Sequence, residues 1–213
     1  MFKGTVIEKE YYSLLERHLV PRLIQLRLKP NHVSFLGLFS SVMAGASFVY
    51  YPFFGGLFTL LTGLLDTLDG SLARALGQNK KYGAFLDSIL DRYTELIIYL
   101  GIWCYFYRRG TTTPLISLIL LLILFGSLMV SYTRARAEGL GVHCLAGVFQ
   151  RGERIVLLGF AGLVNPVVNL LSERLDNQSL LDAVLVVALL ILAAGTNLTA
   201  LWRFMHVLNS LRR

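Results

Sequence analysis

Long apolar stretches separated by short polar ones dominate the pattern of this chain. Residues 117–131 contain no charged side chain, and neither do residues 183–201. Crossing the hydrocarbon core of a bilayer takes about 20 mostly apolar residues. Pro52, Pro114 and Pro166 fall near the ends of such stretches, where helix breaks are expected. The pattern predicts an all-α integral membrane protein with six transmembrane helices, at residues 32–51, 53–76, 80–107, 114–138, 153–171 and 179–208.

The first 30 residues follow a different pattern. Leucines recur at helical spacing among basic positions over residues 8–29, which is typical of an amphipathic helix lying on a membrane surface. Pro21 is the position at which this helix is expected to break. We therefore divide the chain into a juxtamembrane arm, residues 1–30, and a six-helix transmembrane domain, residues 31–213.

Composition and charge support a multi-pass membrane protein. Of the 213 residues, 55% are hydrophobic and 15% are charged, whereas a soluble domain carries about 25% charged residues. The net charge of +7 could indicate a nucleic-acid ligand, but the predicted spans place 17 of the 20 Lys and Arg residues on the side of the termini. Only Arg108, Arg109 and Arg174 lie on the other side. This bias predicts cytoplasmic termini in the cell membrane and no nucleic-acid partner.

Four aspartates interrupt the second and third predicted spans. A carboxylate within a span costs about 3 kcal/mol or more unless it faces water or pairs with a cation. At about 100° per residue, those of the second span share a sector of about 140° with small residues and an arginine. Those of the third span follow a glycine at intervals of four residues, and each interval turns the helix by a net angle of about 40°, so the three residues also share one face. The two faces are therefore expected to meet across the turn at residues 78–80, with these members: Asp66, Asp69, Gly70, Ala73, Arg74, Gly83, Asp87 and Asp91.

The chemistry of these residues favours a metal and a phosphate ligand. Clustered carboxylates repel one another, and a hard divalent cation with oxygen ligands relieves the repulsion. Gly70, Ala73 and Gly83 leave room for a flat polar ligand to approach the helix backbone, and Arg74 can bind a phosphate. Small residues in membrane helices also serve as plain helix contacts, which is the alternative interpretation.

The spacing Asp-x2-Asp-Gly-x2-Ala-Arg-x8-Gly-x3-Asp-x3-Asp resembles the signature of the CDP-alcohol phosphotransferase family at all eight fixed positions. The resemblance implies transfer of a phosphatidyl-type group from a CDP-linked lipid to an alcohol, with release of CMP. It implies that Asp66, Asp69 and Asp87 hold Mg²⁺ or Mn²⁺, and that Asp91 is the general base and also touches a metal. The residues expected to bind the CDP-lipid are Asp69, Gly70, Ala73, Arg74 and Gly83.

Basic side chains gather at the cytoplasmic ends of the last three predicted spans: Arg134, Arg136, Arg151, Arg154 and Arg203. Guanidinium groups bind phosphate through paired hydrogen bonds, so this group predicts a pocket for an anionic acceptor. The alternative is topological anchoring and contact with lipid headgroups.

The segment Ser-Tyr-Thr-Arg-Ala-Arg-Ala-Glu, residues 131–138, resembles the phosphatidylinositol-phosphate synthase branch of the family, including its archaeal members. The resemblance implies inositol phosphate as the acceptor. Arg134 stands where lysine is common in that branch. The positions that match phosphate-binding residues of the branch are Ser131, Arg134, Arg136, Arg154 and Arg203.

Other functions fit the pattern less well. A phosphatidylglycerol-phosphate synthase is the nearest alternative, because glycerol 3-phosphate would also need a basic pocket. A cation transporter would place its carboxylates near the bilayer midplane, and a non-catalytic scaffold leaves the phased aspartates unexplained. The resemblance further implies a homodimer, with membrane lipids covering the remaining apolar faces.

Overall fold

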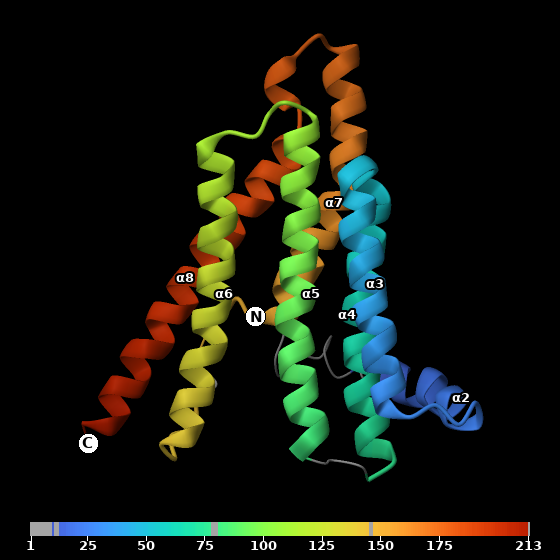
Figure 1. Ribbon diagram of the computed structural model, residues 1–213, viewed down its shortest axis with the longest axis vertical. Coiled ribbons are helices and arrows are strands. Elements are labelled where there is room, and N and C mark those ends of the chain that lie inside the picture. Colours follow the sequence, from blue (N-terminus) through green and yellow to red (C-terminus); the bar gives the residue numbers. More distant parts are fainter. Residues whose placement is uncertain (1–9, 11–12, 78–80, 145–146, 213) are drawn as a thin grey trace.

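The computed structural model describes residues 10, 13–77, 81–144 and 147–212, and this part of the chain contains only helices and their connections. The long helices lie side by side and alternate in direction (Figure 1). Each agrees with a predicted span to within four residues at either end. They are α3 (Pro30–Tyr50), α4 (Pro52–Ala75), α5 (Lys81–Arg108), α6 (Pro114–Gly139), α7 (Arg151–Arg174) and α8 (Ala183–Leu211).

Four of these helices, α3, α6, α7 and α8, are long and apolar enough to cross a membrane. Helices α4 and α5 have 24 and 28 residues, and at about 1.5 Å per residue each is also long enough for a hydrocarbon core of about 30 Å. They differ from the others because they carry the aspartates. The two long helices outside the group of four are thus the ones that build the predicted site.

Two of the three prolines lie where the sequence predicts breaks. Pro52 and Pro114 are the first residues of α4 and α6, a position where the missing N–H of proline costs nothing. The prediction for Pro166 is wrong, because this residue lies inside α7, which continues to Arg174. Packed membrane helices tolerate an internal proline when neighbouring groups satisfy the freed backbone.

The N-terminal arm remains helical through Pro21, so the predicted break does not occur. A π-helical turn, η1 (Leu15–Leu19), leads directly into α2 (Val20–Gln25). The wider turn changes the hydrogen-bond register just before the proline. Leu15 and Val20 are buried against Val33, Leu68 and Leu72, so the arm packs on the ends of α3 and α4 that carry the site.

The opposite end of the bundle is tied by Asp182, whose carboxylate is 4% exposed. It accepts hydrogen bonds from the Tyr105 hydroxyl at 2.5 Å, Asn165 at 2.9 Å and Asn169 at 2.8 Å, and it pairs with Arg109 at 3.4 Å. Asp182 has a left-handed backbone with φ 55°, and a 3-10 turn, η2 (Gln178–Leu180), precedes it. For this reason α8 begins four residues later than predicted.

Helices α3 and α5 cross at Gly45 and Gly101. A Cβ atom on Gly45 would lie 2.7 Å from the Ile97 carbonyl oxygen, and one on Gly101 would collide with the Gly45 backbone. This contact holds α3 and α5 close together and so carries the start of α3 to the aspartates of α5.

We expect Gly101→Ala to lower the free energy of unfolding by about 1–3 kcal/mol, because the new methyl group overpacks the crossing. Thermal unfolding of the detergent-solubilised protein measures the loss. Gly139→Ala is the matched control, since nothing lies within 4 Å of the position of its added Cβ. Equal melting temperatures for the two variants would contradict the close crossing.

Candidate active site

Three of the predicted metal ligands meet where α4 ends and α5 begins. Asp66 and Asp69 from α4 and Asp87 from α5 each bring one carboxylate oxygen to a group whose members lie within 4.8 Å of one another. Asp69 is 7% exposed and the other two are half-buried. Three negative charges this close need a counter-charge, and hard oxygen donors are the ligands that Mg²⁺ and Mn²⁺ prefer. The three residues therefore fit a divalent cation.

Asp91, the fourth predicted ligand, lies outside this group and makes an ion pair with Arg151 of α7. Arg151 also forms an ion pair with Asp66, and Arg92 lies 3.7 Å from Asp91. All four aspartates and Arg151 nevertheless line one small cavity. Arg151 was expected among the acceptor-binding arginines; the structure places it among the acids, where it links Asp91 to the rest of the cluster.

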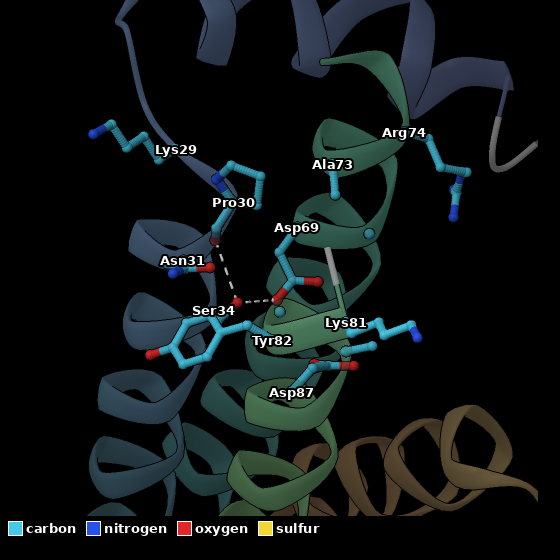
Figure 2. Close-up of a pocket in the computed structure, with 13 residues that line it drawn as sticks. Lys29, Pro30, Asn31, Ser34, Asp69, Ala73, Arg74, Lys81, Tyr82 and Asp87 are labelled. Atoms are coloured by element: carbon cyan, nitrogen blue, oxygen red, sulfur yellow. Dashed lines mark hydrogen bonds between the residues drawn. The ribbon is translucent and has the colours of Figure 1, made fainter. Parts of the chain in front are cut away.

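A cavity of about 830 Å³ opens beside the carboxylates. In Figure 2 the side chains of Asp69 and Asp87 lie close together on its wall, beside Ser34 at the start of α3. Every residue that the sequence assigned to the CDP-lipid lines it: Asp69, Gly70, Ala73, Arg74 and Gly83. The structure thus confirms that these faces of α4 and α5 meet around one cavity.

The two glycines of this group face open space. A Cβ on Gly83 would meet nothing within 4 Å, and one on Gly70 would meet only the tip of Arg74 at 3.6 Å. At Gly101, by contrast, an added Cβ would enter a neighbouring helix. Gly70 and Gly83 are therefore not helix contacts, and their small size keeps the cavity wide.

Several residues that line the cavity were not found from the sequence: Lys29, Asn31, Ser34, Lys81 and Tyr82. The Ser34 hydroxyl donates a hydrogen bond to Asp69 Oδ2 at 2.6 Å (Figure 2), which orients that carboxylate. Lys29 and Lys81 add positive charge at the rim. The polar start of the first span was the available signal, but only the packing of α3 against α4 brings Ser34 to an aspartate 35 residues away.

The predicted acceptor residues lie on α6, α7 and α8. Arg154 is 3% exposed and binds Glu95 at 2.7 Å and the Ser127 hydroxyl at 2.6 Å. Arg203 is also buried and donates to the Val130 carbonyl at 2.7 Å. It lies close enough to Arg134 and Arg154 for their charges to interact. Arg134 itself is exposed and pairs with Glu138 at 2.8 Å. Arg154 and Arg203 therefore form a buried basic region, and Arg134 lies at its edge.

The other two members behave differently. The Ser131 hydroxyl donates to the Ser127 carbonyl at 3.3 Å, one turn from the residue that contacts Arg154. Arg136 is exposed and, at about 100° per residue, points about 160° away from Arg134 around α6. The structure does not bring Arg136 to the group. Glu95, which the sequence analysis missed, is the acidic partner at its centre.

Apolar helices that enclose a cluster of carboxylates, a wide cavity and a buried basic region define a membrane protein suited to a metal and phosphorylated ligands. Residues 27–166 match the family model described as CDP-alcohol phosphatidyltransferase. The match spans more than half of the chain, and the protein belongs to this family.

Several curated relatives carry names from one branch of the family. The chain is 32% identical to an archaetidylinositol phosphate synthase of Methanothermobacter thermautotrophicus, over 95% of each chain. It is 38% identical to a protein of the same name from Pyrococcus horikoshii, over 68% of this chain and 74% of the relative.

A solved structure has the same fold. The phosphatidylinositol phosphate synthase of Mycobacterium tuberculosis with CDP-DAG bound superposes with a TM-score of 0.75 at 26% identity, over 91% of this chain and 93% of that one. A second structure of that enzyme contains manganese and citrate, with a TM-score of 0.72 at 25% identity, over 89% and 87% of the chains. The protein is therefore a multi-pass membrane enzyme, a CDP-alcohol phosphotransferase of phospholipid biosynthesis.

We expect Asp87→Asn to weaken Mn²⁺ binding by more than about tenfold, because changes outside the ligand shell alone cost about that much. Electron paramagnetic resonance of free Mn²⁺ during titration of the purified protein measures the affinity without catalysis. Glu173→Gln is the matched control, because Glu173 is an exposed acid near the C-terminal end of α7, away from the aspartates. Equal affinities in the two variants would exclude Asp87 as a ligand.

Proposed function

We propose that this enzyme transfers a phosphatidyl-type group from CDP-diacylglycerol, or its ether-linked archaeal analogue, to a hydroxyl of inositol phosphate, with release of CMP. The choice of acceptor is supported by the positions of two arginines on α7. Arg151 touches Asp66 and Asp91, and Arg154, one turn further, belongs to the buried basic region. A phosphate bound there would place the hydroxyl of its carrier beside the acids.

The names of the relatives support this acceptor. Two archaeal relatives are archaetidylinositol phosphate synthases and the mycobacterial enzyme is a phosphatidylinositol phosphate synthase, and the chain covers more than two thirds of each. Arg154 and Arg151 also have a buried Nε–H without a hydrogen-bond partner among the described residues. An unsatisfied buried donor is costly, and the oxygens of an anionic acceptor would satisfy it.

The donor fits the large cavity. Gly70 and Gly83 leave space for the nucleotide, and the positive charges of Arg74, Lys29 and Lys81 line the wall where a diphosphate would lie. A divalent cation bound by Asp66, Asp69 and Asp87 would neutralise charge on the diphosphate as CMP departs. Ser34 holds the Asp69 carboxylate in the orientation that this binding requires.

Asp91 is proposed as the general base, in contact with the metal when it is bound. The acceptor oxygen forms a bond to the lipid-side phosphorus, the bond from that phosphorus to CMP breaks, and the hydroxyl proton passes to the Asp91 carboxylate. A carboxylate is a weak base for an alcohol, so orientation must supply much of the rate. The ion pair with Arg151 fixes that orientation.

We also propose six membrane spans over residues 31–213, with residues 1–30 as an interfacial arm and with both termini and the site on the cytoplasmic side. The helix directions support this layout, because Arg108, Arg109 and Arg174 fall at the ends away from the aspartates. The many exposed apolar side chains would face lipid and a second copy in a homodimer.

With CDP-diacylglycerol and Mg²⁺, we expect the purified protein to release CMP when inositol phosphate is added, and much less with inositol, serine or glycerol 3-phosphate. Chromatographic measurement of CMP gives the rates, and a sample without acceptor is the control. Release with glycerol 3-phosphate alone would replace the acceptor by that of a phosphatidylglycerol-phosphate synthase. No release with any acceptor would contradict the proposed function.

We expect Asp91→Asn to lower kcat by at least about 100-fold, the usual contribution of a positioned general base. Binding of CDP-diacylglycerol, measured by calorimetry in detergent, should change little because Asp91 is not among the residues that line the large cavity. Substantial turnover in this variant would rule out Asp91 as the base. The melting temperature of the variant checks that the fold is retained.

A further inference from the structure

Glu95 lies in the middle of α5, four residues after Asp91, and is 7% exposed. It contacts side chains from three helices. Arg154 of α7 lies 2.7 Å away, the Ser127 hydroxyl of α6 donates to it, and Arg92 of its own helix lies at 3.4 Å. A buried carboxylate with this many partners is a junction of the bundle rather than a surface charge.

Glu95 and Ser127 together determine how Arg154 is held. Nη2 of Arg154 forms an ion pair with Glu95 and Nη1 donates a hydrogen bond to Ser127. Contacts at both terminal nitrogens fix the orientation of the guanidinium group. Its Nε–H is buried and has no partner among the described residues. A buried guanidinium without its counter-charge would be strongly unfavourable. Glu95 therefore both neutralises Arg154 and leaves one of its donors available.

The same residue connects the basic region with the acids. Arg92 lies between Glu95 at 3.4 Å and Asp91 at 3.7 Å. Arg151 joins Asp91 to Asp66 from the adjacent turn of α7. Charges of alternating sign thus run without a gap from the predicted metal ligands to Arg154: Asp66, Arg151, Asp91, Arg92, Glu95 and Arg154. The position of Arg154 relative to the acids depends on this series.

We propose that Glu95 is a positioning residue for the anionic acceptor: it orients Arg154 so that the free N–H receives the acceptor phosphate at a fixed distance from Asp91. Glu95 itself touches no reacting atom. This inference rests on the proposed function, and it deepens that function by naming the residue that sets the geometry of the acceptor site. It applies to any phosphomonoester acceptor that Arg154 binds.

The test compares steady-state kinetics of Glu95→Gln with the wild type, using CDP-diacylglycerol, inositol phosphate and Mg²⁺. Glutamine keeps the size of the side chain but removes the charge that holds Arg154. We expect KM for inositol phosphate to rise by about tenfold or more, because an Arg154 that is no longer oriented by the ion pair would lose its charged hydrogen bond to the acceptor phosphate. KM for CDP-diacylglycerol should change less than about twofold, because Glu95 does not line the large cavity. Glu95→Asp should recover part of the loss, and Glu173→Gln is the neutral control.

A double-mutant comparison separates positioning from general packing. If Glu95 acts through Arg154, the variant with both Glu95→Gln and Arg154→Gln should have the same KM for inositol phosphate as Arg154→Gln alone. Additive effects, or a fall in kcat with both KM values unchanged, would overturn the inference. So would an unchanged KM for inositol phosphate in Glu95→Gln.

The wild type distinguishes this failure from failure of the proposed function. An active wild type with an unaffected Glu95→Gln variant contradicts the inference alone. A wild type that releases no CMP with inositol phosphate or glycerol 3-phosphate contradicts the proposed function, and the inference with it. Equal melting temperatures in detergent confirm that each comparison is made on folded protein.

Discussion

Repulsion among carboxylates at one end of an apolar helix bundle is the constraint on which the rest of this structure depends. One carboxylate oxygen from each of Asp66, Asp69 and Asp87 lies within 4.8 Å of the other two, on helices α4 and α5. Such a cluster is stable only if positive charge reaches it. Arg151 supplies part of that charge from α7, and a divalent cation would supply the remainder. These ion pairs join α7 to α4 and α5 at the end of the bundle that carries the site.

The proposed donor and acceptor regions lie on opposite sides of the carboxylate cluster. On one side of the carboxylates the helices open into a wide cavity whose glycines leave the backbone accessible. On the other side Glu95 carries negative charge one turn deeper and holds Arg154. The aspartates therefore lie between a region suited to a nucleotide diphosphate and a region suited to a phosphate monoester. The chain belongs to the CDP-alcohol phosphatidyltransferase family, and the proposed reaction would take place between these two ligands.

Much of this arrangement could be predicted from the sequence because it depends on local periodicity. Uncharged runs locate the long helices, and the fixed spacing of the aspartates converts directly into helix phase, which is why Gly70 and Gly83 were placed correctly beside Asp69. Proline at the start of a helix has a strong local signal, as at Pro52 and Pro114.

The features that were missed depend on how distant helices meet. Ser34 reaches Asp69 only because α3 crosses close to the hairpin. Arg151 and Arg154 pair with acids on other helices because of how α7 packs in the bundle. The spacing of residues within α7 does not predict those partners. Asp182 delays the start of α8 because the amide groups of two α7 asparagines donate hydrogen bonds to its carboxylate.

The most direct test of the central claim is a crystal structure of the full chain with Mn²⁺, with anomalous diffraction measured at the manganese edge. The account predicts an anomalous peak within coordination distance of carboxylate oxygens from Asp66, Asp69 and Asp87. An anomalous map with no peak at these three residues, or with manganese bound only elsewhere, would contradict it.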